Sequence, residues 1–297
     1  MGIPCSVIVM TKNEERNIRK CLRSVASFAE VFVVDSSSTD GTCKVAEEMG
    51  AIVVQFVWNG GYPKKKEWSL RNLPFRNRWV LFVDADEELT PAGADEIQRV
   101  LNNELAKRQH AGFFAGYDYA FLSRVLKHGF RTYKLVLLDH QRSRFLEYDD
   151  LGPGSLGEIE GHYQPVVDGT VGRLNERMVH RDHDSLFHYF ERHNRYSDWE
   201  AFRRQKGLVG LKAESDIGMR KRMKQLFALM PCKGAIAFID SYLLRLGLLD
   251  GAAGFHYAVA RGTYYWQIGA KLRELKLSNS RASSGADAQA TVSLRAD

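Results

Sequence analysis

Short runs of apolar and β-branched residues alternate with amphipathic segments over the first hundred residues, and this alternation constrains the fold more than any other feature. Residues 5–10, 31–34, 52–57 and 79–83 have the length and composition of buried strands. The segments between them carry helix signals, such as the cap at Thr39-Asp40-Gly41. Repeated βα units predict an α/β fold in which a sheet is covered by helices on both faces.

Polar residues follow three of these predicted strands, at residues 11–14, 35–40 and 84–88. Open α/β sheets bind ligands at the carboxyl ends of their strands, so these clusters predict a shared site. The chain has neither a glycine-rich dinucleotide fingerprint nor a P-loop, so side chains and a metal would have to hold any nucleotide. Asp84 and Asp86, two apart at a strand end, offer oxygen ligands that suit Mg²⁺ or Mn²⁺.

Cysteine and charge patterns exclude several classes of protein. The four cysteines show no CxxC pair or histidine-flanked spacing, which excludes a zinc knuckle or a disulfide scaffold. The net charge is +6, and a basic cluster at residues 220–224 directly precedes the apolar residues 226–230. Such a cluster predicts peripheral binding to an anionic membrane surface, here the inner face of a bacterial cytoplasmic membrane. No nucleic-acid-binding motif accompanies the charge, so we expect no nucleic-acid partner.

Three segments resemble one enzyme family in order and in spacing. Residues 6–14 read SVIVMTKNE, residues 33–42 read VVDSSSTDGT and residues 82–87 read FVDADE. They are similar to the inverting family 2 glycosyltransferases of GT-A fold, in particular the bacterial lipopolysaccharide-core β-1,4-glucosyltransferase-like and exopolysaccharide transferases. The resemblance covers roughly residues 4–105.

This resemblance implies a nucleotide-diphosphate-sugar donor, UDP-linked by expectation, and a saccharide or lipid-linked acceptor in cell-surface polysaccharide or lipopolysaccharide biosynthesis. It implies Mg²⁺ or Mn²⁺ as cofactor, with Asp86 and His180 at the metal. The residues expected at the donor are Thr11, Asn13, Glu14, Asp35, Ser37, Lys66, Arg71 and Asp84.

An inverting transfer needs one general base to take the acceptor proton. Relatives of this branch carry a Val-His-Glu segment, whereas this chain reads Ile-Glu-Gly-His at residues 159–162. Glu160 and His162 are two apart on a predicted extended segment, so both would project from one face. Asp182 is a third candidate, and the sequence leaves the choice open.

The predicted organisation is a catalytic domain over residues 1–184, divided into a donor half (1–105) and an acceptor half (106–184). A helical region at 185–277 is expected to lie on the membrane, and residues 278–297 are expected to form a disordered tail. Two other functions remain open: transfer to a polyprenyl phosphate, and a non-catalytic nucleotide-sugar-binding subunit of a polysaccharide assembly complex.

Overall fold

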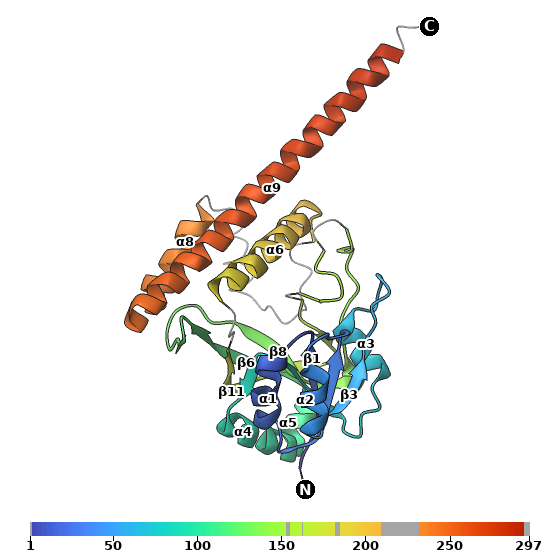
Figure 1. Ribbon diagram of the computed structural model, residues 1–297, viewed down its shortest axis with the longest axis vertical. Coiled ribbons are helices and arrows are strands. Elements are labelled where there is room, and N and C mark those ends of the chain that lie inside the picture. The colour runs from blue at the N-terminus through green and yellow to red at the C-terminus, as the bar shows by residue number, and fades with distance from the viewer. Residues whose placement is uncertain (1, 153–154, 162, 182–184, 209–231, 294–297) are drawn as a thin grey trace.

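A mixed sheet organises the N-terminal part of the protein (Figure 1). The computed structural model describes residues 2–152, 155–161, 163–181, 185–208 and 232–293, with side chains up to residue 279. The sheet has the strand order β3-β2-β1-β4-β8-β6-β11-β5, and β7 pairs with β6 beside this path. Its strands are β1 (Ile3–Thr11), β2 (Phe28–Asp35), β3 (Ile52–Gln55), β4 (Trp79–Asp84), β5 (Glu87–Leu89), β6 (His110–Phe121), β7 (Arg124–Val125), β8 (Tyr133–Asp139) and β11 (Thr170–His180). The α/β prediction is confirmed, and the four strands predicted in the first hundred residues are all present.

The register of the parallel strands aligns their polar ends. Thr11 at the end of β1 pairs with Asp35 at the end of β2, and Met10 pairs with Asp84 at the end of β4. On the acceptor side, β8 runs antiparallel to both β4 and β6. His180 at the end of β11 lies opposite Glu87 of β5. The residues predicted at the three strand ends therefore do meet at one edge of the sheet.

Two apolar layers hold the helices on opposite faces of the sheet. Alternate residues of β1 serve the two layers, with Val7 and Val9 on one face and Ile8 on the other. The first layer packs against α1, α2 and α4, and the second packs against α3. The helices and short strands around the sheet are α1 (Glu15–Ser24), α2 (Thr42–Glu48), α3 (Lys65–Asn72), α4 (Pro91–Asn102), α5 (Glu104–Gln109), η1 (His140–Arg142), β9 (Ser143–Arg144) and β10 (Val166–Val167).

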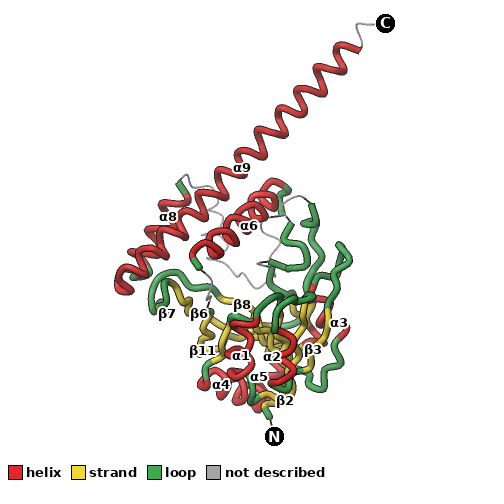
Figure 2. The backbone as a smooth tube through the Cα atoms, viewed as in Figure 1, coloured by secondary structure: helices red, strands yellow, loops and turns green. Residues whose placement is uncertain are grey.

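A helical C-terminal region packs on the acceptor side of the sheet (Figures 1 and 2). It comprises α6 (Leu186–Gln205), α8 (Lys233–Ile239), η2 (Asp240–Leu244), η3 (Gly247–Asp250) and α9 (Gly251–Ser293). Ala253, Tyr257 and Ala260 of α9 form a small core with Phe121 and Leu126 around the β6–β7 hairpin. Among the described helices, none is both long and apolar enough to cross a membrane.

The structure differs from the sequence predictions in two segments. Residues 278–293 were expected to be disordered, but they continue α9, which projects away from the body in Figure 1. This stretch contains several alanines and no proline, so nothing interrupts the helical hydrogen bonding. The segment around Glu160 was expected to be extended, but it turns, and Gly161 has a φ of 62°. Alternate residues therefore do not share a face there.

A buried ion pair joins the segment before α3 to Asp150, which in turn binds a residue of α6. Lys64 and Asp150 are almost fully buried, and the Lys64 ammonium lies 2.9 Å from the Asp150 carboxylate. The same carboxylate accepts hydrogen bonds from the Tyr62 hydroxyl and, at 3.2 Å, from the Trp199 indole nitrogen. Both charges are thus compensated inside the protein.

Replacing Asp150 with alanine should lower the free energy of unfolding by about 3–5 kcal/mol, because it leaves a buried ammonium without its counter-ion. Urea denaturation measures this loss. The neighbouring Asp149 is 78% exposed and pairs with Lys206 on the surface, so Asp149→Ala is the matched control. It should cost less than about 1 kcal/mol. Equal losses in the two variants would contradict a structural role for the buried pair.

Candidate active site

The donor-side end of the site is built from the loops that follow β1 and β2. The Thr11 hydroxyl donates to Asp35 Oδ1 at 2.9 Å, and both residues are buried. Burial alone would raise the pKa of Asp35. Hydrogen bonds from Ser38 and Thr11 outweigh burial and hold this pKa below its ordinary value. Asp35 is therefore a preorganised anionic acceptor at the sheet edge.

Asn13, Glu14 and Ser37 lie in the same two loops. Asn13 Oδ1 accepts the Thr39 backbone N–H at 2.8 Å, and the Glu14 backbone N–H donates to the Thr42 hydroxyl at 2.7 Å. Asn13 and Ser37 both have positive φ, at 58° and 55°. These contacts hold the two loops together, and the Ser37 side chain is exposed at their surface.

Four acidic residues crowd the end of β4 and the start of β5, at positions 84, 86, 87 and 88. Lys134 of β8 compensates two of them: its ammonium lies 2.8 Å from Asp84 Oδ2 and 2.5 Å from Glu87 Oε1. Burial would raise the pKa of Asp84, but the nearby Lys134 and Lys66 hold it well below its usual range. Glu87 is 1% exposed, and its burial raises its pKa despite the same lysine.

His180 completes this acidic end. Its Nε2 lies 3.5 Å from Asp86 Oδ2, and its Nδ1 lies 3.8 Å from Glu87 Oε1. Nδ1 is buried and makes no hydrogen bond to any described residue. On its other side the imidazole contacts the Tyr119 ring, edge to face at 5.2 Å between centroids.

The residues present fit a divalent cation in part. An imidazole nitrogen and a carboxylate oxygen 3.5 Å apart can share a first-row divalent cation, whose ligands lie at about 2.1 Å. Within the described ranges, no group of three or more His, Cys, Asp or Glu side chains is arranged to hold a metal. The described chain thus offers two donor atoms, from Asp86 and His180. Lys134 pairs with Asp84 and Glu87, and Arg181 pairs with Glu88.

The three consecutive lysines predicted near the donor have three different positions. Lys64 is in the buried pair described above. The Lys65 ammonium is also buried, donates to the Thr11 carbonyl at 2.7 Å, and has its pKa lowered by burial to about 8. Lys66 points toward the acidic end, with its Nζ 3.8 Å from Asp84 Oδ1. Of the three, Lys66 is the one that faces the acidic end of β4.

Arg71, also predicted at the donor, lies on the last turn of α3. Its Nε lies 2.7 Å from Glu67 Oε1, and its guanidinium is 3.9 Å from Glu147. The side chain is half exposed in this pairing. The structure does not bring Arg71 into contact with Asp84 or Asp35.

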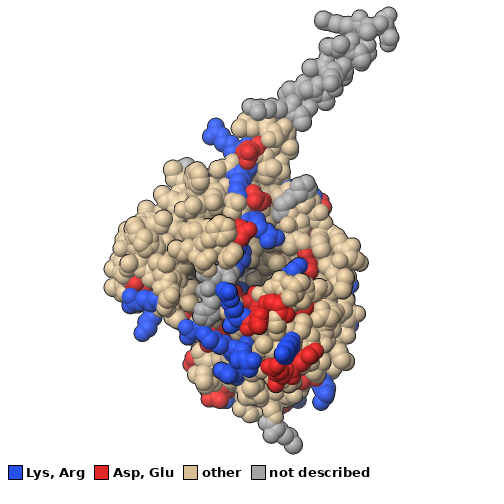
Figure 3. Space-filling view, viewed as in Figure 1, with Lys and Arg blue, Asp and Glu red and all other residues tan. Residues whose placement is uncertain are grey.

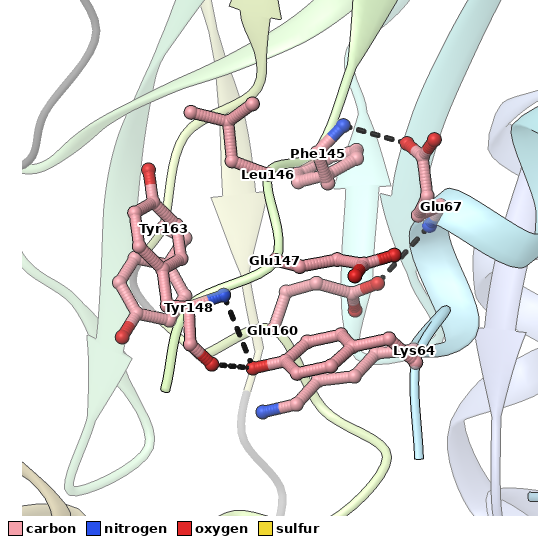
Figure 4. A pocket seen from close by; sticks show the side chains of 9 residues that line it. Lys64, Glu67, Phe145, Leu146, Glu147, Tyr148, Glu160 and Tyr163 are labelled. Carbon is pink, nitrogen blue, oxygen red and sulfur yellow. Dashed lines mark hydrogen bonds between the residues drawn. The ribbon is translucent and has the colours of Figure 1, made fainter. Parts of the chain in front are cut away.

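Glu160 lies at the N-terminus of α3 (Figure 4). Its Oε1 accepts the backbone N–H groups of Lys66 at 2.6 Å and of Glu67 at 3.0 Å, so it satisfies two amides of the first helical turn. Burial raises its pKa to about 7, although Lys66 and the two amides act in the opposite direction. The other two base candidates, His162 and Asp182, lie outside the described residues.

Comparison with known proteins supports the assignment that these residues suggest. Residues 6–146 match the profile of glycosyl transferase family 2. This segment, just under half of the chain, is similar to that family. An uncharacterized glycosyltransferase of Rickettsia bellii is 41% identical over 100 residues, which cover 33% of this chain and 33% of the relative. The chain thus aligns with only about a third of the length of such relatives.

Two more distant similarities extend over nearly all of the chain. The lipopolysaccharide core biosynthesis glycosyltransferase LpsC of Rhizobium meliloti is 24% identical over 287 residues, covering 91% of this chain and 92% of LpsC. The mannosyltransferase PcManGT of Pyrobaculum calidifontis, solved with GDP-Man and Mn²⁺, superposes with a TM-score of 0.52 at 16% identity. That match covers 92% of this chain and 87% of the solved one, and it confirms the GT-A fold.

Lys134 and Glu87 were missed as functional residues by sequence reasoning. Lys134 reads as the polar start of an apolar strand, and Glu87 as one acid among four. The one available signal was the run of acids itself, because so many carboxylates at a buried strand end require a counter-ion.

Lys134→Met should lower the free energy of unfolding by about 2–4 kcal/mol, since it leaves the buried Glu87 carboxylate without its cation. The loss should be larger at pH 8 than at pH 5, because Glu87 has a raised pKa and takes up a proton as the pH falls. Chemical denaturation at the two pH values measures both effects.

Lys107→Met is the control, because Lys107 is about as exposed as Lys134 but pairs with the exposed Glu104. Its effect should stay below about 1 kcal/mol. A pH-independent loss in Lys134→Met would contradict the charge-compensation argument.

Proposed function

We propose that this chain is an inverting glycosyltransferase that moves a sugar from a nucleotide-diphosphate donor, most simply a UDP-sugar, to a saccharide or lipid-linked acceptor in lipopolysaccharide-core or related polysaccharide assembly. The observation that carries the proposal is the meeting of Thr11 and Asp35 with Asp84, Asp86 and His180 along one sheet edge. The role of LpsC in lipopolysaccharide core biosynthesis supports the acceptor class.

The donor would lie along this edge with its nucleoside at the β1 and β2 ends. The Asp35 carboxylate, kept ionised by its hydrogen bonds, is the acceptor there for nucleoside N–H or O–H groups. Asp84 would face the ribose and the sugar. Lys66 carries a positive charge on the Asp84 side and would contact the diphosphate.

Asp86 and His180 would hold the divalent cation, which when bound neutralises the negative charge that builds up on the leaving diphosphate. Lys134 keeps Asp84 and Glu87 compensated by an internal cation. The intact Asp86 and His180 pair argues against a purely structural, non-catalytic subunit.

The proposal is tested by incubating the protein with UDP- and GDP-sugars and Mn²⁺ and measuring thermal unfolding and nucleotide release. One donor should raise the unfolding temperature, because a ligand that binds only the native state stabilises it. Asp86→Ala should remove the Mn²⁺-dependent part of this shift and abolish nucleotide release.

The matched control is Glu88→Ala, since Glu88 lies in the same acidic run but pairs with Arg181 instead of His180. If no nucleotide-sugar stabilises the wild type, or if Asp86→Ala remains fully active, the proposal is wrong.

Glu160 is the proposed base among the candidates that the structure describes. A carboxylate with a pKa of about 7 is half ionised near neutral pH and can accept a proton there. Its bonds to the α3 amides fix its position, so capping and proton acceptance involve the same side chain.

Glu160→Gln keeps an oxygen that can bind the α3 amides, but it cannot take a proton from the hydroxyl of the acceptor substrate. We expect kcat to fall by about 10²-fold or more while donor affinity is retained. The wild-type kcat/KM should rise with pH through about 7. Glu147→Gln is the control, because Glu147 and Glu160 line one pocket (Figure 4) but the Glu147 side chain is exposed. Unchanged kcat in Glu160→Gln would restrict Glu160 to capping and move the base to His162 or Asp182.

Stability gives a second, activity-independent readout of Glu160. Because its folded pKa is raised above the ordinary value of 4.5, the unfolded state releases the proton first. Wild type should therefore lose stability relative to Glu160→Gln as the pH rises from 4.5 to about 7. A pH-independent difference in unfolding free energy would contradict the raised pKa.

A further inference from the structure

An apolar surface that no described residue covers extends from the end of α8 over η2 and η3, beside the start of α9. Six aliphatic side chains form it, each between 41% and 74% exposed. We call it the leucine face, and its members are Ile239, Leu243, Leu244, Leu246, Leu248 and Leu249. Neighbouring exposed residues on α9, Phe255 and Val259, continue it. Exposed apolar patches of this extent mark interaction sites.

Two polar residues of this segment, Ser241 and Asp250, point inward, whereas Arg245 is exposed and pairs with Asp240. Ser241 and Asp250 are buried, and both bind the loop that follows β7. Asp250 accepts the backbone N–H groups of Lys127 and His128, at 3.1 and 2.7 Å, and Ser241 accepts that of Phe130. Because Ser241 and Asp250 anchor the segment to this loop, the leucines between them are turned to the outside together with Arg245.

Two breaks in the helix fix this orientation. Leu246 is left-handed with a φ of 59°, and Gly251 has a φ of 63°. The chain therefore changes direction on both sides of η3, and α9 starts only at Gly251. Gly247 packs tightly in the bend, since a Cβ there would lie 2.6 Å from the Ser241 carbonyl. The exposure of the leucines is thus held by the backbone geometry.

Cations border the leucine face. Arg124 and Lys127 are exposed, and Arg124 Nη1 donates to the Asp250 carbonyl at 3.3 Å, which puts it beside η3. Over residues 232–260 the only acids are Asp240, which pairs with Arg245, and the buried Asp250. Figure 3 shows the region around α8 as a broad uncharged surface with Lys and Arg side chains at its lower border.

We propose that the leucine face binds the anionic surface of a lipid bilayer. Aliphatic side chains bordered by Lys and Arg match such a surface, which takes up apolar groups at the acyl boundary and cations at the headgroups. A second copy of the chain fits less well, because a twofold contact through this face would bring the cations of one copy near those of the other. The basic cluster at residues 220–224 lies outside the described residues and carries no part of this argument.

The helix that follows the leucine face, α9, reaches the candidate active site. Tyr257 of α9 stacks on Tyr119, and Tyr119 contacts His180. A bilayer bound to the leucine face would thus hold a lipid-linked acceptor near the metal end of the site. This last link rests on the proposed function, whereas bilayer binding itself does not.

The test is co-sedimentation of the full chain with vesicles of phosphatidylcholine, with and without phosphatidylglycerol. Wild type should bind the anionic vesicles and not the neutral ones. Leu244→Glu with Leu248→Glu should weaken this binding about tenfold or more, because it places carboxylates at an anionic surface. Arg124→Gln with Lys127→Gln should weaken it at low salt, with a smaller effect at high salt.

Leu105→Glu is the matched control, because Leu105 is 63% exposed but lies on α5, at the opposite end of the molecule (Figure 1). It should bind vesicles like wild type. Thermal unfolding checks that each variant is folded, and Leu244→Ser replaces the double variant if that one is not. Nucleotide release measured without vesicles tests the proposed glycosyltransferase function separately. A failure of that function can therefore be distinguished from a failure of bilayer binding.

Three results would overturn the proposal. The first is equal sedimentation of wild type with anionic and neutral vesicles, or no sedimentation with either. The second is that the leucine variants bind vesicles as strongly as wild type, whereas replacing Arg220, Lys221, Arg222 and Lys224 together abolishes vesicle binding. The third is a wild-type dimer in analytical ultracentrifugation that the leucine variants convert to a monomer without any change in vesicle binding, which would assign the face to a second copy.

Discussion

The parallel pairing of β1 with β2 on one side and β4 on the other is the constraint on which the site depends. It brings the ends of three strands to one edge, so that Thr11, Asp35 and Asp84 meet although they are far apart in the sequence. The apolar alternation along β1 fixes the register, because a slip of one residue would expose the buried faces of both layers. The packing of the strands and the position of these polar residues therefore have the same origin.

Charge compensation is the second requirement of this edge. Three carboxylates, at Asp84, Asp86 and Glu87, lie close together at a buried strand end, and Lys134 and Lys66 bring two cations to them. Asp86 is left to face His180. Lys134 thus compensates Asp84 and Glu87 inside the protein, and Asp86 is the acid that we propose for an external cation.

The sequence predicted the sheet and the polar residues at its strand ends because their pattern is local: an apolar run followed directly by a carboxylate. It did not predict Lys134, which is fifty residues from Asp84 and reaches it only because β8 is inserted antiparallel beside β4. Nor did it predict the contacts of Glu160, since the two amides belong to a helix more than ninety residues earlier. The prediction of an extended segment around Glu160 was wrong because the chain turns at Gly161.

Tyr119 joins two parts of the molecule that the chain keeps apart. One side of its ring contacts His180, and it also stacks on Tyr257 of α9. Any displacement of Tyr257 with α9 would therefore remove one of the two ring neighbours of Tyr119, and His180 is the other. If a ligand at the C-terminal helices and a ligand at His180 both change the position of this ring, each would alter the affinity for the other by the same factor. One tyrosine ring would then be the physical connection between the two surfaces.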